Sequence, residues 1–386
     1  MKKIAIRRRS MQQCTIWLSV ILGLSITARV ESSSHYATTS GAGPEVPVVP
    51  ALFIFGDSLA DPGNNNHLVS LAKANHPPYG RQFDTQKATG RFSNGRTALD
   101  FLAAELGLPL VPPFMDPETK GSKLLQGVNY ASAGSGILNS TGMFFGEIIT
   151  TWKQLEYFRD KTQPEVNRLL GKKNGSDFFR KSLYYIISGS NDFVNGYYFV
   201  IPTSPPGISI TDFTQLLVNT TSQQLKTLYE LGARKVGVAG LAPLGCCPSQ
   251  ITKYNLTSGG CVEFLNDVSK QYNTALKKML SELRAELKDL HLVYSNLYDP
   301  LLEAINNPAK FGFNSTHDAC CGVGKLHGKF ICMPYSRPCD DPQDHIFFDY
   351  YHPTDTMYNL IFKSVYFNGP PLSEPYSGQY LANLKI

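Results

Sequence analysis

Short apolar runs alternate with longer amphipathic segments along most of this chain. The runs are rich in β-branched or aromatic residues, are bounded by turn residues, and lie at 51–55, 127–131, 183–188, 235–239 and 291–295. Most of them lack a strict alternation of apolar and polar residues, which is typical of strands that are covered on both faces. We therefore expect a central parallel sheet of about five strands.

Between these runs, apolar residues recur every three or four positions, as in a helix with one buried face. The predicted helices span 96–106, 211–231, 262–290 and 353–367. Gly232 is a natural stop for the second helix, and Pro353 suits the first turn of the last. Strand–helix alternation favours an α/β fold, a three-layer α/β/α sandwich with helices on both faces of the sheet.

No Pro-, Gly- or Ser-rich linker and no internal repeat interrupts residues 50–386, so we expect this segment to be a single domain. In an open parallel sheet, chemistry gathers at the carboxyl ends of the strands. The residues that follow the predicted strands are therefore the first candidates for a functional site.

The first 28 residues have the pattern of a secretory signal peptide. Five Lys and Arg residues precede an apolar run at 15–28 that is shorter than the ~20 residues needed to span a bilayer. Residues 29–49, rich in Ser, Thr, Gly and Pro, are expected to form a flexible leader. The formal net charge of the whole chain is +5. The signal segment carries five positive charges and no acidic residue, so the chain without it has a net charge of zero. A near-neutral mature chain gives no reason to expect a nucleic-acid partner.

Two further patterns favour secretion, with an extracellular destination such as the apoplast or cell wall. Five Asn-x-Ser/Thr sequons are candidate glycosylation sites, at Asn139, Asn174, Asn219, Asn255 and Asn314. Seven of the eight cysteines lie beyond the signal segment, in clusters at 246, 247 and 261 and at 320, 321, 332 and 339. In an oxidising compartment such clusters indicate disulfides. We expect no transmembrane segment and a monomer.

Zinc is the alternative interpretation of the second cluster, with His317 or His327 as a further ligand. Neither cluster has the paired C-x-x-C spacing of a zinc site, so we expect no metal and no cofactor. Adjacent Cys320 and Cys321 are poor partners for each other. Two pairings therefore stay open, with Cys320 bonded either to Cys332 or to Cys339.

Residues that can carry out acyl chemistry follow the predicted strands. Ser58 comes directly after the first strand, where a nucleophile belongs, although a serine there is more often a turn or cap residue. The small-residue stretch 127–136 and Asn191 are turn-formers that could instead donate hydrogen bonds to an oxyanion. Asp349 lies three residues before His352, so its carboxylate can orient the imidazole. The G-x-S-x-G elbow of α/β-hydrolases is absent.

Taken in order, these blocks resemble those of the SGNH hydrolases, and the chain as a whole resembles a plant GDSL esterase/lipase. The resemblance covers roughly residues 50–370, and its motifs lie at 55–66, 93–96, 127–132, 189–192, 245–248, 319–322 and 349–354. It implies a flavodoxin-like SGNH hydrolase fold. The family usually has one cysteine where this chain has Cys246 and Cys247. Cys247 is therefore the candidate free thiol, and Cys246 is expected to pair with Cys261.

The resemblance also implies roles for the residues at the strand ends. Ser58 would be the nucleophile of a triad with Asp349 and His352, and an oxyanion hole would comprise the Ser58 and Gly134 amides and the Asn191 side chain. The implied function is that of a secreted esterase/lipase that acts through an acyl-enzyme on a lipid, an acylated sugar or a small metabolite ester. An acyltransferase with the same triad is the alternative, and an idle binding protein is a weaker one. Aromatic residues at 143–145 and 197–199 could line an acyl pocket or simply pack in the core.

Overall fold

The computed structural model describes residues 46–199, 207–254 and 260–386. The expected signal peptide, the leader up to residue 45 and the Asn255 sequon lie outside these residues, as does Cys14. Residues 46–49, the end of the expected leader, are described. The Val48 amide donates a 3.0 Å hydrogen bond to the Leu106 carbonyl, and Val49 is buried, so this end packs on the domain.

A six-stranded sheet forms the centre of the described chain, in the order β2-β1-β3-β4-β5-β6. Its strands are β1 (Leu52–Gly56), β2 (Gly127–Asn129), β3 (Leu183–Ile187), β4 (Lys235–Ala239), β5 (His291–Ser295) and β6 (Ser373–Glu374). The first five are parallel, as predicted, and β6 adds an antiparallel edge against β5. The two-residue β6 is too short for a sequence pattern to predict.

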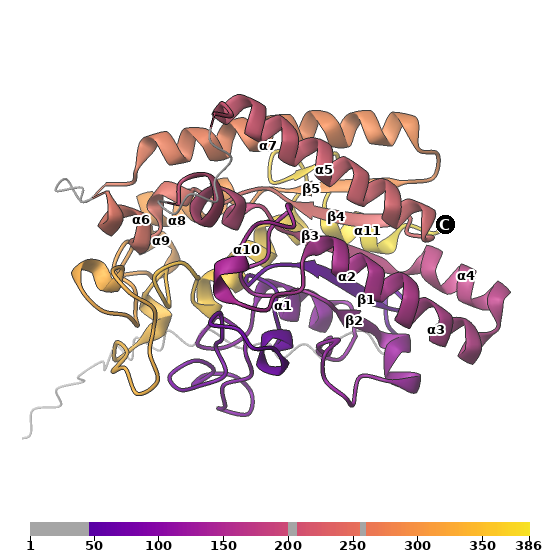
Figure 1. Cartoon of the computed structure of the whole chain (residues 1–386), viewed down its shortest axis with the longest axis horizontal. Helices are drawn as coiled ribbons and strands as arrows, with labels where there is room; N and C mark the ends of the chain where they lie inside the picture. The colour runs from indigo at the N-terminus through magenta and orange to yellow at the C-terminus, as the bar shows by residue number, and fades with distance from the viewer. Residues whose placement is uncertain (1–45, 200–206, 255–259) are drawn as a thin grey trace, which may run out of the picture. The chain divides into compact units, whose positions relative to one another are not determined.

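Helices cover both faces of the sheet, as expected for a three-layer sandwich. One face carries α2 (Thr151–Tyr157), α3 (Gln163–Leu170), α4 (Lys172–Lys181), α5 (Ile210–Glu230) and α7 (Glu263–Glu286). The other carries α1 (Ala98–Glu105), α8 (Tyr298–Asn306), α10 (Asp355–Phe367) and α11 (Gly378–Asn383). Figure 1 shows α5 and α7 side by side above the sheet. Alternate residues of β1 explain the two layers, because Phe53 and Phe55 face the first set of helices whereas Leu52 and Ile54 face the second.

The four predicted helices are present with shifted ends. The last begins at Asp355 rather than Pro353, because the Thr354 side chain accepts a hydrogen bond from the Met357 amide and caps the helix. α1 begins after Thr97, which forms a reciprocal capping box with Asp100. Strand β2 ends at Asn129, but its hydrogen bonding to β1 continues through the amides of Tyr130 and Ser132.

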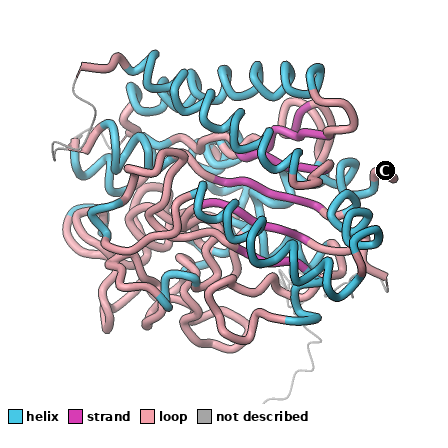
Figure 2. The backbone as a smooth tube through the Cα atoms, turned by 45° about the vertical axis from the view of Figure 1, so that its right-hand side comes forward, coloured by secondary structure: helices cyan, strands magenta, loops and turns pink. Residues whose placement is uncertain are grey.

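Long loops gather at one side of the strands, drawn pink in Figure 2. They follow the carboxyl ends of the strands and include the short helices α6 (Pro248–Lys253) and α9 (Pro308–Phe311). Ser58 and Asn191 lie in these loops, just beyond β1 and β3. Within the described residues, no helix is long and apolar enough to cross a membrane.

Candidate active site

Ser58, His352 and Asp349 form a chain of hydrogen bonds at the carboxyl end of β1. The Ser58 Oγ lies 2.8 Å from His352 Nε2. The other ring nitrogen, Nδ1, lies 2.7 Å and 2.8 Å from the two carboxylate oxygens of Asp349. All three residues are buried, and Asp349 has no exposed surface. Residues 294 positions apart in the sequence are thus placed in hydrogen-bonding contact.

The Asp349 carboxylate has further donors besides the imidazole. The Tyr79 hydroxyl donates to Oδ2 at 2.6 Å, and the amides of Tyr351 and His352 donate to Oδ1 at 2.9 Å and 2.8 Å. Burial acts to raise the pKa of Asp349, but His352 and these donors outweigh it and hold the pKa below its ordinary value. Asp349 is therefore anionic at neutral pH.

The anionic partner determines which nitrogen of His352 carries the proton. A carboxylate can only accept hydrogen bonds, so the Nδ1 that faces Asp349 is protonated in the neutral imidazole. The lone pair of Nε2 then points at the Ser58 hydroxyl. Phe92 packs against the imidazole with ring centroids 4.6 Å apart, which restricts its rotation. The geometry suits transfer of the Ser58 proton to Nε2.

The end of β1 places Ser58 through a constrained turn. Gly56 has φ of +151°, and a Cβ there would lie 2.1 Å from the Ile187 carbonyl oxygen, so only glycine fits. The Gln154 side chain of α2 bonds both backbone groups of Gly56, accepting from its amide at 2.8 Å and donating to its carbonyl at 2.9 Å. Gln154 therefore fixes the backbone of Gly56, which precedes Asp57 and Ser58.

The candidate oxyanion donors are the amides of Ser58 and Gly134 and the Asn191 side chain, and all three residues line one pocket. In the described part of the chain, neither the Ser58 amide nor the Gly134 amide donates to another protein group, although both residues are buried. The Asn191 Nδ2 donates one of its two hydrogens to the Ser135 carbonyl at 2.9 Å. The Asn195 side chain donates to Asn191 Oδ1 at 2.7 Å, so both ends of the Asn191 amide have partners that fix its orientation.

The loop after Ser58 is bonded to the loop after β2, which carries Gly134. The buried Asp61 carboxylate accepts from the amides of Gly63 and Asn64 at 2.7 Å and from the Ala133 amide at 2.9 Å. Asn64 and Asn65 extend this link by donating to the carbonyls of Ala131 and Ala133. The two loops that provide the candidate donors therefore have a fixed separation.

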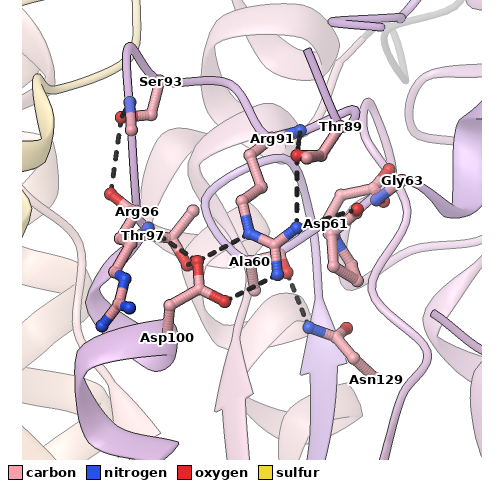
Figure 3. A network of polar contacts seen from close by, with 12 residues as sticks. Ala60, Asp61, Gly63, Thr89, Arg91, Ser93, Arg96, Thr97, Asp100 and Asn129 are labelled. Atoms are coloured by element: carbon pink, nitrogen blue, oxygen red, sulfur yellow. Dashed lines mark hydrogen bonds and ion pairs between the residues drawn. The ribbon is translucent and has the colours of Figure 1, made fainter. Parts of the chain in front are cut away.

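A buried ion pair holds the same region from the side of α1. Figure 3 shows the Arg91 guanidinium between Asp100 and the loop around Asp61. It donates to both Asp100 oxygens at 2.7 Å and to the Pro62 carbonyl at 3.2 Å. Burial acts to raise the pKa of Asp100, but Arg91 outweighs it and lowers the pKa. This pair supports the turn, and neither of its residues lines the pocket at Ser58.

A pocket of about 120 Å³ opens at Ser58. Ser58, Gly134, Asn191 and His352 line it, and most of its other lining residues are apolar. Of the aromatic residues at 143–145 and 197–199, Phe145 is the one that lines this pocket, whereas Tyr197 and Tyr198 pack against the core. The site thus combines a polar end at Ser58 with an apolar interior.

Comparison with known proteins shows the family of the chain. Residues 52–365 match the family model described as GDSL-like lipase/acylhydrolase. The chain belongs to this family. It is 38% identical over 365 residues to GDSL esterase/lipase At5g08460 of Arabidopsis thaliana, covering 93% of this chain and 92% of that protein. It is 40% identical over 346 residues to GDSL esterase/lipase 7 of the same plant, covering 88% and 93% of the two chains. As a GDSL-family protein, it is a carboxylic ester hydrolase with the SGNH hydrolase fold.

Among the residues that the structure describes, three disulfides stabilise the loops. Cys246 bonds Cys261, and Cys247 is a buried free thiol. Of the two pairings that the sequence left open, the structure has Cys320 with Cys339 and Cys321 with Cys332. Cys332 and Cys247 both line the pocket at Ser58, so the loops that these bonds hold form part of its wall.

Sequence analysis missed three residues that hold the candidate site in place: Tyr79, Gln154 and Asn195. No local pattern relates Tyr79 to Asp349, because 270 positions separate them. Gln154 lies 98 positions from Gly56, so residue spacing could not have predicted this contact either. Asn195 could have been found, because it lies four residues after Asn191 in a helical turn (η5, Asp192–Tyr197), where side chains at that spacing meet.

The remaining sequence candidates lie at the surface of the GDSL-family chain. The described sequon residues Asn139, Asn174, Asn219 and Asn314 are all exposed. Asn174 and Asn219 lie in helices α4 and α5. Within the described ranges, no group of three or more His, Cys, Asp or Glu residues is placed to hold a metal ion.

Proposed function

We propose that this chain cleaves carboxylic esters through a covalent acyl-enzyme on Ser58, with His352 as general base and Asp349 as its orienting partner. The observation that carries the proposal is the continuous hydrogen-bond chain from Ser58 Oγ through the imidazole to a buried carboxylate. Such a chain activates a hydroxyl that is a weak nucleophile by itself.

The first step forms a bond between Ser58 Oγ and the ester carbonyl carbon, while the Ser58 proton moves to His352 Nε2. The carbonyl oxygen becomes an oxyanion, which the amides of Ser58 and Gly134 and the Asn191 side chain stabilise. Donors that already point at the developing charge need no reorganisation during the reaction. His352 then protonates the leaving alcohol, and the ester C–O bond breaks.

Water completes the cycle by attacking the acyl carbon while His352 takes one of its protons. The bond between the acyl carbon and Ser58 Oγ then breaks, His352 returns the proton to Ser58 Oγ, and the free acid leaves. The same intermediate would transfer its acyl group to an alcohol acceptor, which is the second candidate function. Adding glycerol to the assay measures this competition. Transesterified product at the expense of free acid would favour an acyltransferase.

The decisive variant is Ser58→Ala, with Ser188→Ala as a matched control. Ser188 also follows a strand, has the same 9% exposure, and its hydroxyl has no partner among the described residues. We expect Ser58→Ala to lose at least about 10³-fold in kcat on 4-nitrophenyl butyrate, and Ser188→Ala to lose little. Equal losses in both variants, or an active Ser58→Ala protein, would contradict the proposal. Wild-type protein without activity on any ester would indicate an idle binding protein.

We also propose secretion, on the basis of the signal-like residues 1–28 and the disulfides between residues 246 and 339. Expression of the full chain with a C-terminal tag in plant cells tests it. We expect the protein in the extracellular fluid, with an N-terminus beyond residue 28 and a mass that falls on glycosidase treatment. A full-length protein retained in the cytosol would contradict secretion.

A further inference from the structure

Exposed apolar side chains gather beside the entrance of the pocket at Ser58. The described residues expose fourteen large apolar side chains, and six of these either line the pocket or lie within two positions of a residue that does. Isolated exposed apolar residues are ordinary on a protein surface, whereas a group of them marks an interaction site. We call these six residues the apolar rim: Val69, Leu71, Met143, Phe144, Phe330 and Met333.

Two segments of the apolar rim are bonded to each other. The Leu71 amide donates to the Phe145 carbonyl at 2.7 Å, and the Glu147 amide donates to the Val69 carbonyl at 2.9 Å. The Glu147 carboxylate in turn accepts from the Val69 amide at 2.7 Å. The side chains of Val69 and Leu71 are nevertheless 80% and 76% exposed. A backbone that is already ordered loses little conformational entropy when such side chains meet a partner.

The apolar rim is continuous with the candidate active site. Leu71 is exposed and also lines the pocket, so it lies at the entrance. Phe145 lines the pocket too, and its ring packs against Gly134, where a Cβ would lie 2.6 Å from it. The Phe145 ring also contacts Phe144, which stacks on Phe199 with ring centroids 4.5 Å apart. Apolar side chains therefore extend from the exposed surface to a candidate oxyanion donor.

The charges on the segments of the apolar rim do not favour an ionic partner. Apart from His67, the segments 67–73, 141–147 and 330–333 contain one basic residue, Lys73, and one acidic residue, Glu147. Attraction to an anionic membrane requires a cluster of Lys and Arg residues, and these segments have none. The partner that fits them has an uncharged, apolar surface.

The position of the apolar rim decides between a protein and a lipid as that partner. A protein docked on Leu71 and its neighbours would cover the entrance and keep the substrate out. A surface that consists of ester lipid would instead present the substrate at the entrance. Apolar side chains that enter the outer layer of a lipid surface are a common means of attachment, with a strength that grows with the apolar area buried.

We propose that the apolar rim docks on the surface of aggregated, uncharged ester lipid and thereby holds the pocket entrance against its source of substrate. This inference rests on the proposed ester cleavage at Ser58. It adds a binding step that precedes the chemistry and involves residues outside the pocket. Esters in an aggregate should therefore be hydrolysed with help from the apolar rim, and dissolved esters without it.

The test measures binding to phosphatidylcholine vesicles by co-sedimentation, in Ser58→Ala protein so that the lipid is not hydrolysed. The double variant Val69→Ser/Met143→Gln changes two rim residues that do not line the pocket, and it leaves the net charge unchanged. We expect it to lower the partition coefficient at least about tenfold, because less apolar surface leaves water. Val46→Ser/Leu216→Gln is the matched control. These residues are also exposed, but neither lies within two positions of a pocket residue. This control should bind within about twofold of the Ser58→Ala parent.

Kinetics with Ser58 intact separate docking from chemistry. The Val69→Ser/Met143→Gln variant should keep kcat/KM on dissolved 4-nitrophenyl butyrate within about twofold of wild type. Its rate on emulsified tributyrin should fall at least about fivefold, and the control variant should match wild type on both substrates. If Ser58→Ala protein still hydrolyses esters, the acyl-enzyme proposal fails, while vesicle binding continues to report on the apolar rim.

Four results would overturn the docking proposal. The first two are no binding of the Ser58→Ala protein to phosphatidylcholine vesicles and unchanged binding in the Val69→Ser/Met143→Gln variant. The third is binding that requires phosphatidylserine in the vesicles, which would indicate a charged surface elsewhere. The fourth is a dimer in size-exclusion chromatography that the double variant abolishes, without vesicle binding, which would assign the apolar rim to a second copy of this chain.

Discussion

The Tyr79 hydroxyl donates a 2.6 Å hydrogen bond to Asp349 Oδ2, on the carboxylate that also faces His352. Tyr79 is buried and also packs edge-on against Phe348, with ring centroids 5.3 Å apart. A residue from the loop after β1 thus bonds the same carboxylate as the imidazole, and its hydroxyl is part of what keeps the pKa of Asp349 low.

Tyr79→Phe removes this hydrogen bond with little change in volume. A carboxylate whose pKa is depressed by folding stabilises the protein above its unfolded pKa of ~3.9, and this contribution disappears as pH falls through the folded value. We therefore expect Tyr79→Phe to be less stable than wild type at pH 7, by about 1.5–3 kcal/mol. The difference should shrink towards pH 3, as chemical denaturation across this range would measure.

Tyr358→Phe is the control for that experiment. Tyr358 is equally buried and also lines the pocket, but its hydroxyl has no hydrogen-bond partner among the described residues. Its removal should leave stability unchanged or slightly raised at every pH. Parallel pH profiles for the two variants would contradict a specific role for the Tyr79–Asp349 contact.

Asn191→Ala should lower kcat by about 10²–10³-fold with little change in KM, because an oxyanion donor acts mainly in the transition state. Asn195→Ala should have a smaller effect of the same kind, since Asn195 acts by orienting the Asn191 amide. The double variant should be no slower than Asn191→Ala alone. Steady-state kinetics of the three proteins decide this, and additive losses would mean that Asn195 does not act through Asn191.

Asp57 is predicted to destabilise the fold increasingly as pH rises. Burial raises its pKa to about 7, and its Oδ2 atom has no partner among the described residues. The folded protein therefore holds a proton that the unfolded chain releases near pH 4, so this group's contribution to stability falls between pH 4 and 7. Asp57→Asn should be more stable than wild type at pH 8, with a gain that fades towards pH 4.

Thermal unfolding at several pH values measures that gain. The exposed Asp177 on α4 provides the control, because its replacement by Asn removes a solvated carboxylate. A flat difference between Asp57→Asn and wild type across this range would show that Asp57 does not titrate there.

Cys247 should be unreactive in the folded protein although it lines the pocket. Burial, aided by the nearby Asp349 charge, raises the pKa of its thiol to about 12, so almost no thiolate is present at pH 8. We expect no iodoacetamide labelling of Cys247 under native conditions and complete labelling in guanidinium without reductant. Peptide mapping of the same samples checks the three disulfides. Rapid native labelling would mean that the wall of the pocket opens.

Local patterns in the sequence were sufficient for the layout of the fold. The apolar run at β1 and the three-to-four spacing of apolar residues in α7 involve only neighbouring residues. The period of two in a strand or 3.6 in a helix can therefore be recognised without knowing how the rest of the chain folds. The same holds for the grouping of Ser58 and Asn191, because parallel strands place their carboxyl ends at one edge of a sheet. The contact between Asp349 and His352 could be predicted from their separation of three residues alone.

Contacts between distant segments were decided by the tertiary structure alone. Tyr79 meets Asp349 and Gln154 clamps Gly56 across 270 and 98 positions, distances at which spacing carries no information. The choice of Cys339 over Cys332 as the partner of Cys320 depends on how their loop closes. The pocket at Ser58 forms only once distant segments pack together, because Leu71, Phe145 and Leu297 line it jointly. Packing of separate elements sets such gaps and contacts, whereas the sequence by itself determines only which faces are apolar.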